Sequence, residues 1–173
     1  MGNTYDISVI RSQMTVENVK FRGEGFTKSR LKSIKKALLT LHTLEIMATN
    51  IYRFQITKKK SELNKELIAA MCNEMTHIQD FEIKLYEYGL RPTIKRYAYL
   101  VLGFCFGFFS RLLGEKAILK VGIWVESKAV SHYAELLEEV EWDEETRKVV
   151  EKDQADEGGH IGRWKAMLES LNN

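Results

Sequence analysis

The chain has little proline and little cysteine, and both shortages restrict what it can be. Its 173 residues include one proline, Pro92, and two cysteines, Cys72 and Cys105. Two cysteines cannot build a disulfide framework, and the N-terminus lacks the charged, apolar, small-residue order of a signal peptide, so we expect a reducing compartment. Cys72 stands two residues before Glu74 and points to another side of a helix, which makes it a poor candidate for a metal ligand.

Strand patterns are also missing. No stretch alternates between apolar and polar residues, and a single proline allows long helices, so the sequence predicts one all-α domain. The formal net charge is only +2, which gives no reason to expect nucleic acid as a partner. Gly23-Glu24-Gly25 indicates a loop. We expect a partly mobile segment over residues 1–26 and a helical domain over residues 27–173, whose first helix is capped by Thr27 or Ser29.

Four glutamates and two histidines form one pattern that occurs twice. Each copy is a lone glutamate followed, 29 positions later in the first copy and 31 in the second, by Glu-x-x-His. This repeat predicts a duplicated helical hairpin with four carboxylates and two imidazoles inside a four-helix bundle, which is the ligand set of a two-iron or two-manganese site. The six candidate metal ligands are Glu45, Glu74, His77, Glu126, Glu157 and His160.

The six candidates lie where their helices should be apolar. On the first expected helix, apolar residues recur at steps of three and four on both sides of Glu45, and on the last helix the same stripe runs from Val150 to Leu171. A single such glutamate could equally lie on a polar face or pair with a lysine. Glutamate is almost never fully buried unless it is paired, so the joint register of all six favours metal binding.

A long aromatic segment joins the two expected hairpins. Residues 97–109 read YAYLVLGFCFGFF, contain no charge and are flanked by Lys95, Arg96 and Arg111. Thirteen helical residues rise about 20 Å, whereas a bilayer needs about twenty residues, so this segment is too short to cross. Its composition favours contact with a membrane surface through about residues 95–111. A crossover helix packed on the bundle, or an interface in a homo-oligomer, are the alternatives.

Five further motifs accompany these features. A histidine precedes the first ligand by three positions, Arg91-Pro92-Thr93 leads into the aromatic segment, Leu112-Leu113-Gly114 ends it, and an acidic residue precedes Glu157. His132 and Tyr133 follow Glu126 by six and seven positions. Over about residues 38–168 the chain resembles the demethoxyubiquinone hydroxylase family, the di-iron enzymes of late ubiquinone biosynthesis.

The resemblance implies a ferritin-like bundle that holds two iron ions, with manganese as the alternative metal. It also implies O₂-dependent hydroxylation of a membrane-borne quinone or quinol ring. The aromatic segment and the expected reducing compartment together predict a peripheral position on the reducing, cytoplasmic side of a membrane. His132 and Tyr133 would then lie near the site and carry electrons or protons. His42, Asp153 and Asp156 are candidates for orienting the ligands, with capping or surface roles as the alternative.

Two differences from the family pattern concern the site. Ile46 and Met47 stand where the family has small residues, so we expect a differently shaped channel beside Glu45. Gly158 and Gly159 either loosen the last ligand helix or permit close helix approach. A rubrerythrin-like or ferritin-like peroxidase or iron oxidase would use the same ligands, and a membrane-bound adaptor would use the metal structurally. The aromatic segment favours a lipid-borne substrate over the peroxidase or iron oxidase, whereas the adaptor would unfold on metal loss without any oxygen chemistry being lost.

Overall fold

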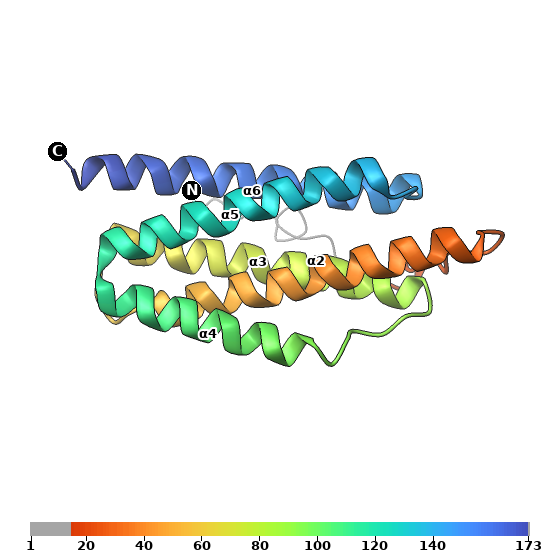
Figure 1. Cartoon of the computed structure of the whole chain (residues 1–173), viewed down its shortest axis with the longest axis horizontal. Helices are drawn as coiled ribbons and strands as arrows, with labels where there is room; N and C mark the ends of the chain where they lie inside the picture. Colours follow the sequence, from red (N-terminus) through yellow and green to blue (C-terminus); the bar gives the residue numbers. More distant parts are fainter. Residues whose placement is uncertain (1–14, 173) are drawn as a thin grey trace, which may run out of the picture.

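The computed structural model describes residues 15–172, and these are almost entirely helical (Figure 1). No strand occurs among them, so the predicted all-α fold is confirmed. A short 3-10 helix, η1 (Val16–Asn18), precedes five α-helices. In chain order these are α2 (Lys28–Gln55), α3 (Glu62–Glu87), α4 (Arg96–Leu113), α5 (Glu115–Glu139) and α6 (Glu144–Ser170).

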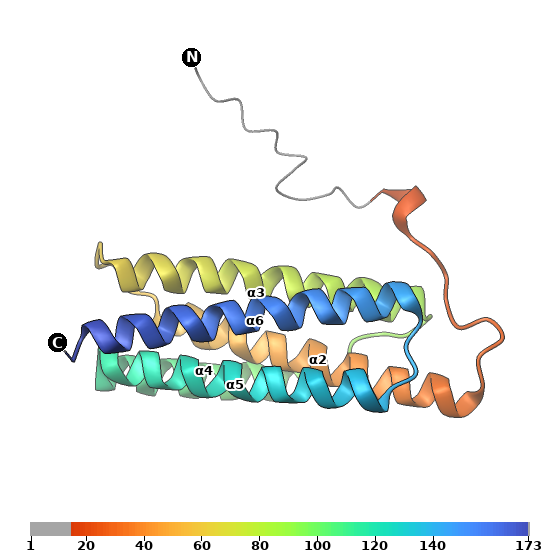
Figure 2. The same ribbon diagram turned by 90° about the horizontal axis from the view of Figure 1, so that it is seen from above.

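The helices form two antiparallel hairpins and one crossover helix. Helices α2 and α3 make the first hairpin, α5 and α6 make the second, and α4 runs along α2 between them (Figure 1). Seen from above, α3 and α6 lie side by side (Figure 2). Side-chain oxygens of Thr27, Ser61 and Asp143 accept hydrogen bonds from backbone N–H groups in the first turns of α2, α3 and α6, respectively. These caps fix where the helices begin.

Two apolar clusters enclose a polar layer at mid-bundle. One cluster lies around Leu41, Phe81 and Val150, and the other lies around Leu67 and Trp164. The predicted inner stripes of α2, α3 and α5 are confirmed, because their members are buried or half-buried. The stripe of α6 ends earlier than predicted. Leu171 lies beyond the last turn and is 40% exposed.

The segment before α2 is tied to one end of the bundle (Figure 2). The Arg22 guanidinium reaches Glu87 at the end of α3 (2.5 Å) and Asp143 at the start of α6 (2.6 Å). Burial opposes ionisation of Glu87, but hydrogen bonds from Arg22 and Lys84 outweigh it and lower the pKa of this carboxyl. The predicted mobile segment, residues 1–26, falls partly on residues 1–14, which lie outside the described residues.

Helix α4 packs closely on α2 through two glycines. A Cβ at Gly103 would lie 2.5 Å from the Met47 carbonyl oxygen, and one at Gly107 would collide with the Ile51 carbonyl oxygen. Small residues four positions apart let two helix backbones approach in this way. By contrast, a Cβ at Gly158 would meet open space, and one at Gly159 would meet only the Arg163 side chain. The idea that Gly158 and Gly159 permit close helix approach is therefore wrong.

The outer side of α4 remains exposed. Among the described residues it is the one helix whose length and composition would allow it to cross a membrane, and 17% of its residues are buried. Its 18 residues rise about 27 Å, close to the thickness of a bilayer core, so the expectation that this segment is too short to cross is wrong as to length. The crossover arrangement predicted as an alternative is thus present, together with a free apolar face.

We predict that Gly103→Ala destabilises the protein by about 1–3 kcal/mol, because the new methyl group must displace the α2 backbone or lift α4 away. Gly158→Ala is the matched control on α6. It should stabilise by about 0.5–1 kcal/mol, since helical glycine carries an entropic cost and the added methyl meets no atom. Urea unfolding of both variants measures the difference. Equal stability of Gly103→Ala and the wild type would contradict the close packing of α4.

Candidate metal centre

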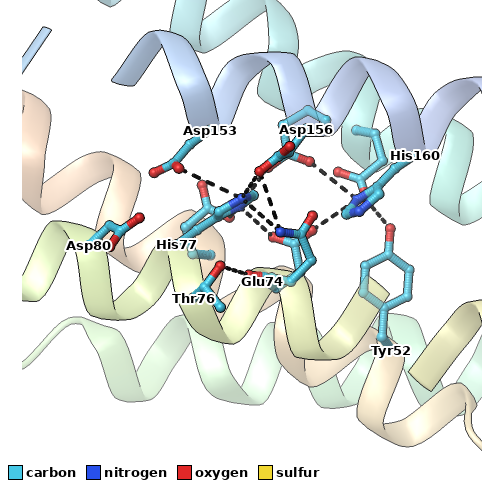
Figure 3. A network of polar contacts seen from close by, with 12 residues as sticks. Tyr52, Glu74, Thr76, His77, Asp80, Asp153, Asp156 and His160 are labelled. Atoms are coloured by element: carbon cyan, nitrogen blue, oxygen red, sulfur yellow. Dashed lines mark hydrogen bonds and ion pairs between the residues drawn. The ribbon is translucent and has the colours of Figure 1, made fainter. Parts of the chain in front are cut away.

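Six buried side chains converge in the polar layer and form two overlapping groups of potential ligand atoms. Glu45, Glu74, His77 and Glu157 form one group, and Glu74, Glu126, Glu157 and His160 form the other. Within each group the ligand atoms lie within 4.8 Å of one another. The structure therefore brings together all six residues singled out in the sequence. Figure 3 shows Glu74 and His77 on α3 opposite His160 on α6.

Two glutamates are shared between the groups. Glu74 directs Oε2 to His77 Nδ1 (3.6 Å) and Oε1 to His160 Nδ1 (3.1 Å). Glu157 does the same from α6, with Oε1 3.2 Å from His77 Nδ1 and Oε2 3.7 Å from His160 Nδ1. Each carboxylate therefore spans the two histidines, as a bridging ligand between two cations would. Glu45 and Glu126 each face one histidine and would be terminal ligands.

Helix geometry explains the convergence. In Glu-x-x-His the two side chains lie one turn apart on the same face of the helix. The lone glutamates come from the middle of α2 and α5, where these helices cross the polar layer. Because each hairpin is antiparallel, the mid-points of its two helices lie side by side. The two hairpins then place both sets of candidate ligands at the same level of the bundle.

The buried carboxylates of the centre favour the binding of cations. Both oxygens of Glu74, both oxygens of Glu157 and Nδ1 of His77 are buried without a hydrogen-bond partner. Burial and the neighbouring Glu126 raise the pKa of Glu74 well above its usual range, and burial and Glu74 do the same for Glu157. Two divalent cations would balance four carboxylates and give each unpartnered atom a ligand bond. The residues present therefore fit a two-metal site.

Two tyrosines hold the terminal glutamates. Tyr133 on α5 donates its hydroxyl hydrogen to Glu45 Oε1 (2.5 Å), and Tyr52 on α2 donates to Glu126 Oε1. Burial and the adjacent carboxylates raise the pKa of both phenols well above 10, so both keep their protons and remain donors. Each terminal carboxylate is thus oriented by a phenol from the helix opposite.

Sequence reasoning placed Tyr133 near the site but did not single out Tyr52. The signal for Tyr52 was present in the repeat. Tyr52 follows Glu45, and Tyr133 follows Glu126, by the same seven positions. Because α2 and α5 run in opposite directions, each tyrosine lies beside the glutamate of the other helix (Figure 1).

His77 also contacts carboxylates through its second ring nitrogen. Its Nε2 lies 3.2 Å from Asp156 Oδ2 and 3.8 Å from Asp153 Oδ1 (Figure 3). A carboxylate at this nitrogen fixes the ring orientation and makes Nδ1 a better metal ligand. The third candidate for such a role, His42, is buried, but neither of its ring nitrogens has a hydrogen-bond partner. Its nearest carboxylate is Glu82, at 3.9 Å.

An apolar cavity of ≈ 260 Å³ opens beside the centre, between α2 and α5. Glu45 and Glu126 form its inner wall. Its remaining lining residues are Leu44, Met47, Ala48, Trp124, Val125, Lys128, Ala129 and His132. Met47 is one of the two residues predicted to reshape a channel beside Glu45, and it does line the cavity. His132 is 47% exposed and pairs with Glu135 at 3.8 Å, so it belongs to the cavity rather than to the buried ligand cluster.

Together, the helical topology and the paired ligand groups define a ferritin-like bundle with a candidate two-metal carboxylate centre. Within that class, the chain belongs to the family described as ubiquinone biosynthesis protein COQ7, whose model matches residues 32–166. This match confirms the family resemblance seen in the sequence motifs.

Three curated relatives carry related names. The NADPH-dependent 3-demethoxyubiquinone 3-hydroxylase, mitochondrial, of Dictyostelium discoideum is 29% identical over 169 residues, which are 89% of this chain and 77% of the relative. The 3-demethoxyubiquinol 3-hydroxylase of Polaromonas sp. is 27% identical over 75% of this chain and 63% of its own length. The protein of Homo sapiens that shares the Dictyostelium protein's name is 26% identical, over 67% and 55% respectively.

We predict that the purified protein binds about two divalent metal ions per chain. Glu74→Ala should remove most of both, because Glu74 faces both histidines, whereas His160→Ala should leave about one. Both variants should also unfold at lower temperature than the metal-loaded wild type, since the remaining carboxylates lose their counter-charge. Elemental analysis and thermal unfolding measure these changes.

Glu62→Ala is the control for the metal prediction, because Glu62 is an exposed glutamate in the first turn of the same helix. It should keep the full metal content. Wild-type metal content in both Glu74→Ala and His160→Ala would refute the assignment of the ligands.

Proposed function

We propose that the chain is an O₂-dependent hydroxylase that acts on the ring of a membrane-borne quinone, using two iron ions held by the six buried ligands. One observation carries the proposal: the terminal carboxylates Glu45 and Glu126 form the inner wall of an apolar cavity. A hydrophobic ring in that cavity would lie directly beside the metals. The hydroxylase names of the three relatives support a quinone-type substrate.

The ligand chemistry supports iron. A mixed set of imidazoles and carboxylates suits a metal that cycles between the ferrous and ferric states, with manganese as the alternative. When bound, the two irons would supply electrons for the reduction of O₂. The candidate bridging ligands, Glu74 and Glu157, lie on the histidine-bearing helices α3 and α6, away from the cavity. The cavity therefore approaches the metals from the side of the terminal ligands.

The residues around the cavity have separable roles in this proposal. Leu44, Ala48 and Val125 exclude water and leave room for a flat ring. Tyr133 holds a proton at Glu45 Oε1, where it orients the carboxylate and can pass the proton inward. His132 stands at the cavity wall with nearly half of its side chain in solvent, so it can exchange protons with water.

We further propose that α4 attaches the protein to a membrane surface through about residues 95–111. Its outer face exposes large apolar side chains, among them Val101 (57%), Phe109 (59%) and Leu112 (66%). Lys95, Arg96 and Arg111 flank this face and suit anionic headgroups. Because α4 lies along α2, an inserted α4 would carry the charged α2 with it, which favours a surface position over a crossing one.

A peripheral position on the reducing, cytoplasmic side of the membrane completes this proposal. Both thiols, Cys72 and Cys105, are free, which is compatible with a reducing environment.

We predict that the iron-loaded protein, given a reductant and O₂, hydroxylates a short-chain demethoxyubiquinone analogue. Tyr133→Phe should lower turnover by about tenfold or more with unchanged iron content, because the proton at Glu45 is lost while the ligands remain. Tyr86→Phe, at a half-exposed tyrosine of α3, is the control and should retain full turnover. Mass spectrometry of the quinone product and iron analysis provide the measurements.

The competing functions give different results in that assay. Rapid consumption of hydrogen peroxide or ferrous ion, with every quinone analogue left unmodified, would replace the hydroxylase proposal with a peroxidase or iron oxidase. A protein that loses only stability when its metal is removed, and that reacts with none of these compounds, would be an adaptor with a structural metal.

We predict that the protein floats with anionic liposomes and does so less at high salt, since the flanking basic residues contribute electrostatically. Val101→Ser combined with Leu112→Ser should reduce flotation at least severalfold while the metal content is unchanged, because both side chains project outward. Ile68→Ser combined with Met75→Ser removes two exposed apolar side chains from α3 and is the matched control. Equal flotation of all three proteins would exclude α4 as the contact surface.

A further inference from the structure

A second apolar hollow lies apart from the metal centre, between α4 and α5. It has a volume of ≈ 400 Å³, and its walls come from one face of α4, including Cys105, Phe106 and Phe109, and from Ala117 and Val121 of α5. A tight turn joins α4 to α5 (Figure 1), and Leu113 and Ala117 on either side of it line the groove. The proposed catalytic mechanism makes no use of it.

The chemistry of the groove fits a hydrocarbon chain. Among the lining residues in the described part of the chain, Ser110 has the only polar side chain apart from the Cys105 thiol. The Ser110 hydroxyl donates to the Gly107 carbonyl (3.1 Å) and accepts from the Gln55 amide (2.9 Å), so its hydrogen-bonding capacity is used within the protein. Within residues 15–172 no charged residue lines the groove, so a phosphate or another headgroup would find no partner among them.

The groove adjoins the cavity beside the metal centre. Along α5, Val121 of the groove is one turn from Val125 of the cavity. Phe106, which lines the groove, and Trp124, which lines the cavity, stand between the two hollows with ring centroids 5.6 Å apart. Both side chains are partly exposed, at 38% and 49%, so they have room to turn. From Glu126 to Ala117, α5 rises about 13 Å, which is longer than a single ring.

We propose that the α4–α5 groove binds the isoprenoid tail of the substrate while its ring occupies the cavity beside Glu45 and Glu126. Rotation of the Phe106–Trp124 pair joins the two hollows. The tail then leaves the protein beside the exposed apolar face of α4, where the bilayer would receive it. This inference rests on the proposed function for the identity of the ring, but the groove can be tested without any turnover.

The two native cysteines provide the test. Cys105 lies in the groove, whereas Cys72 is exposed on α3 and serves as an internal control. The alkylation rate of each thiol is followed by peptide mass spectrometry in the metal-loaded full chain, without reductant or membrane. Two ligands are compared: a dimethoxy-dimethyl-benzoquinone, and the same ring with a two-isoprene tail in place of one methyl group. Both rings are fully substituted and cannot add a thiol at a vacant ring carbon.

The tailed quinone should slow alkylation of Cys105 at least about tenfold and leave Cys72 unchanged, whereas the tail-less quinone should protect neither. Its tail should also strengthen binding at least about tenfold, as measured by quenching of tryptophan fluorescence, because several buried CH₂ groups contribute. Ala117→Phe fills the groove and should abolish both effects. Ala134→Phe makes the same change at an exposed position of α5 and should preserve them.

The possible results separate the groove from the reaction. No protection of Cys105 by the tailed quinone, equal protection by the tail-less one, or protection that survives Ala117→Phe would each overturn the proposal. Protection of Cys105 by the tailed quinone, in a protein that leaves the short-chain demethoxyubiquinone analogue unmodified, would retain the groove and reject the hydroxylase function. Hydroxylation of that analogue without protection of Cys105 by the tailed quinone would do the reverse.

Discussion

The structure depends on the neutralisation of negative charge at the centre of the bundle. Glu45, Glu74, Glu126 and Glu157 are at most 2% exposed, and two histidines cannot balance four carboxylates. Each uncompensated charge in such a place costs several kcal/mol, which exceeds what one buried leucine contributes. Two divalent cations would remove that cost. Metal binding and the folding of the middle of the bundle would then be coupled, while the two apolar clusters hold the helices together on either side of it.

Because the hairpin is duplicated, the centre has nearly twofold symmetry, but its two halves are not equivalent. Asp156 and Asp153 on α6 stand behind His77, one and four positions before Glu157. The corresponding positions before Glu74 on α3 hold Asn73 and Ala70, which carry no charge. The terminal glutamates, by contrast, keep matching tyrosine donors. Two metal ions held here would share Glu74 and Glu157, but one histidine has the stronger carboxylate support, so the affinities of the two positions should differ.

The convergence of the six candidate ligands was predictable from sequence because periodicity and chemistry agree at these positions. A glutamate on the apolar stripe of a helix must have a partner for its charge. When six ligand-type residues share such positions, a metal site explains them better than separate ion pairs do. Other features could not be found in this way. Gly103 and Gly107 have no reactive side chain. Their packing role can be seen only when α4 lies against the α2 backbone in the structure. Arg22 lies in a segment without periodicity, and its partners Glu87 and Asp143 belong to helices far along the chain. Tyr52 was not singled out because its acceptor, Glu126, lies on another helix.

Helix α4 links the metal centre to the proposed membrane surface because its sides have different surroundings. The glycine side lies so close to α2 that a Cβ at Gly103 or Gly107 would meet a carbonyl oxygen of the α2 backbone. A second side faces α5 and forms the groove that ends beside the cavity at Trp124. The third side is apolar and exposed. A bulkier α4–α2 contact would move the groove away from the cavity wall. The two glycines are distant from every metal ligand in sequence and carry no reactive group, yet they set the distance over which a lipid-borne ring could reach the metals.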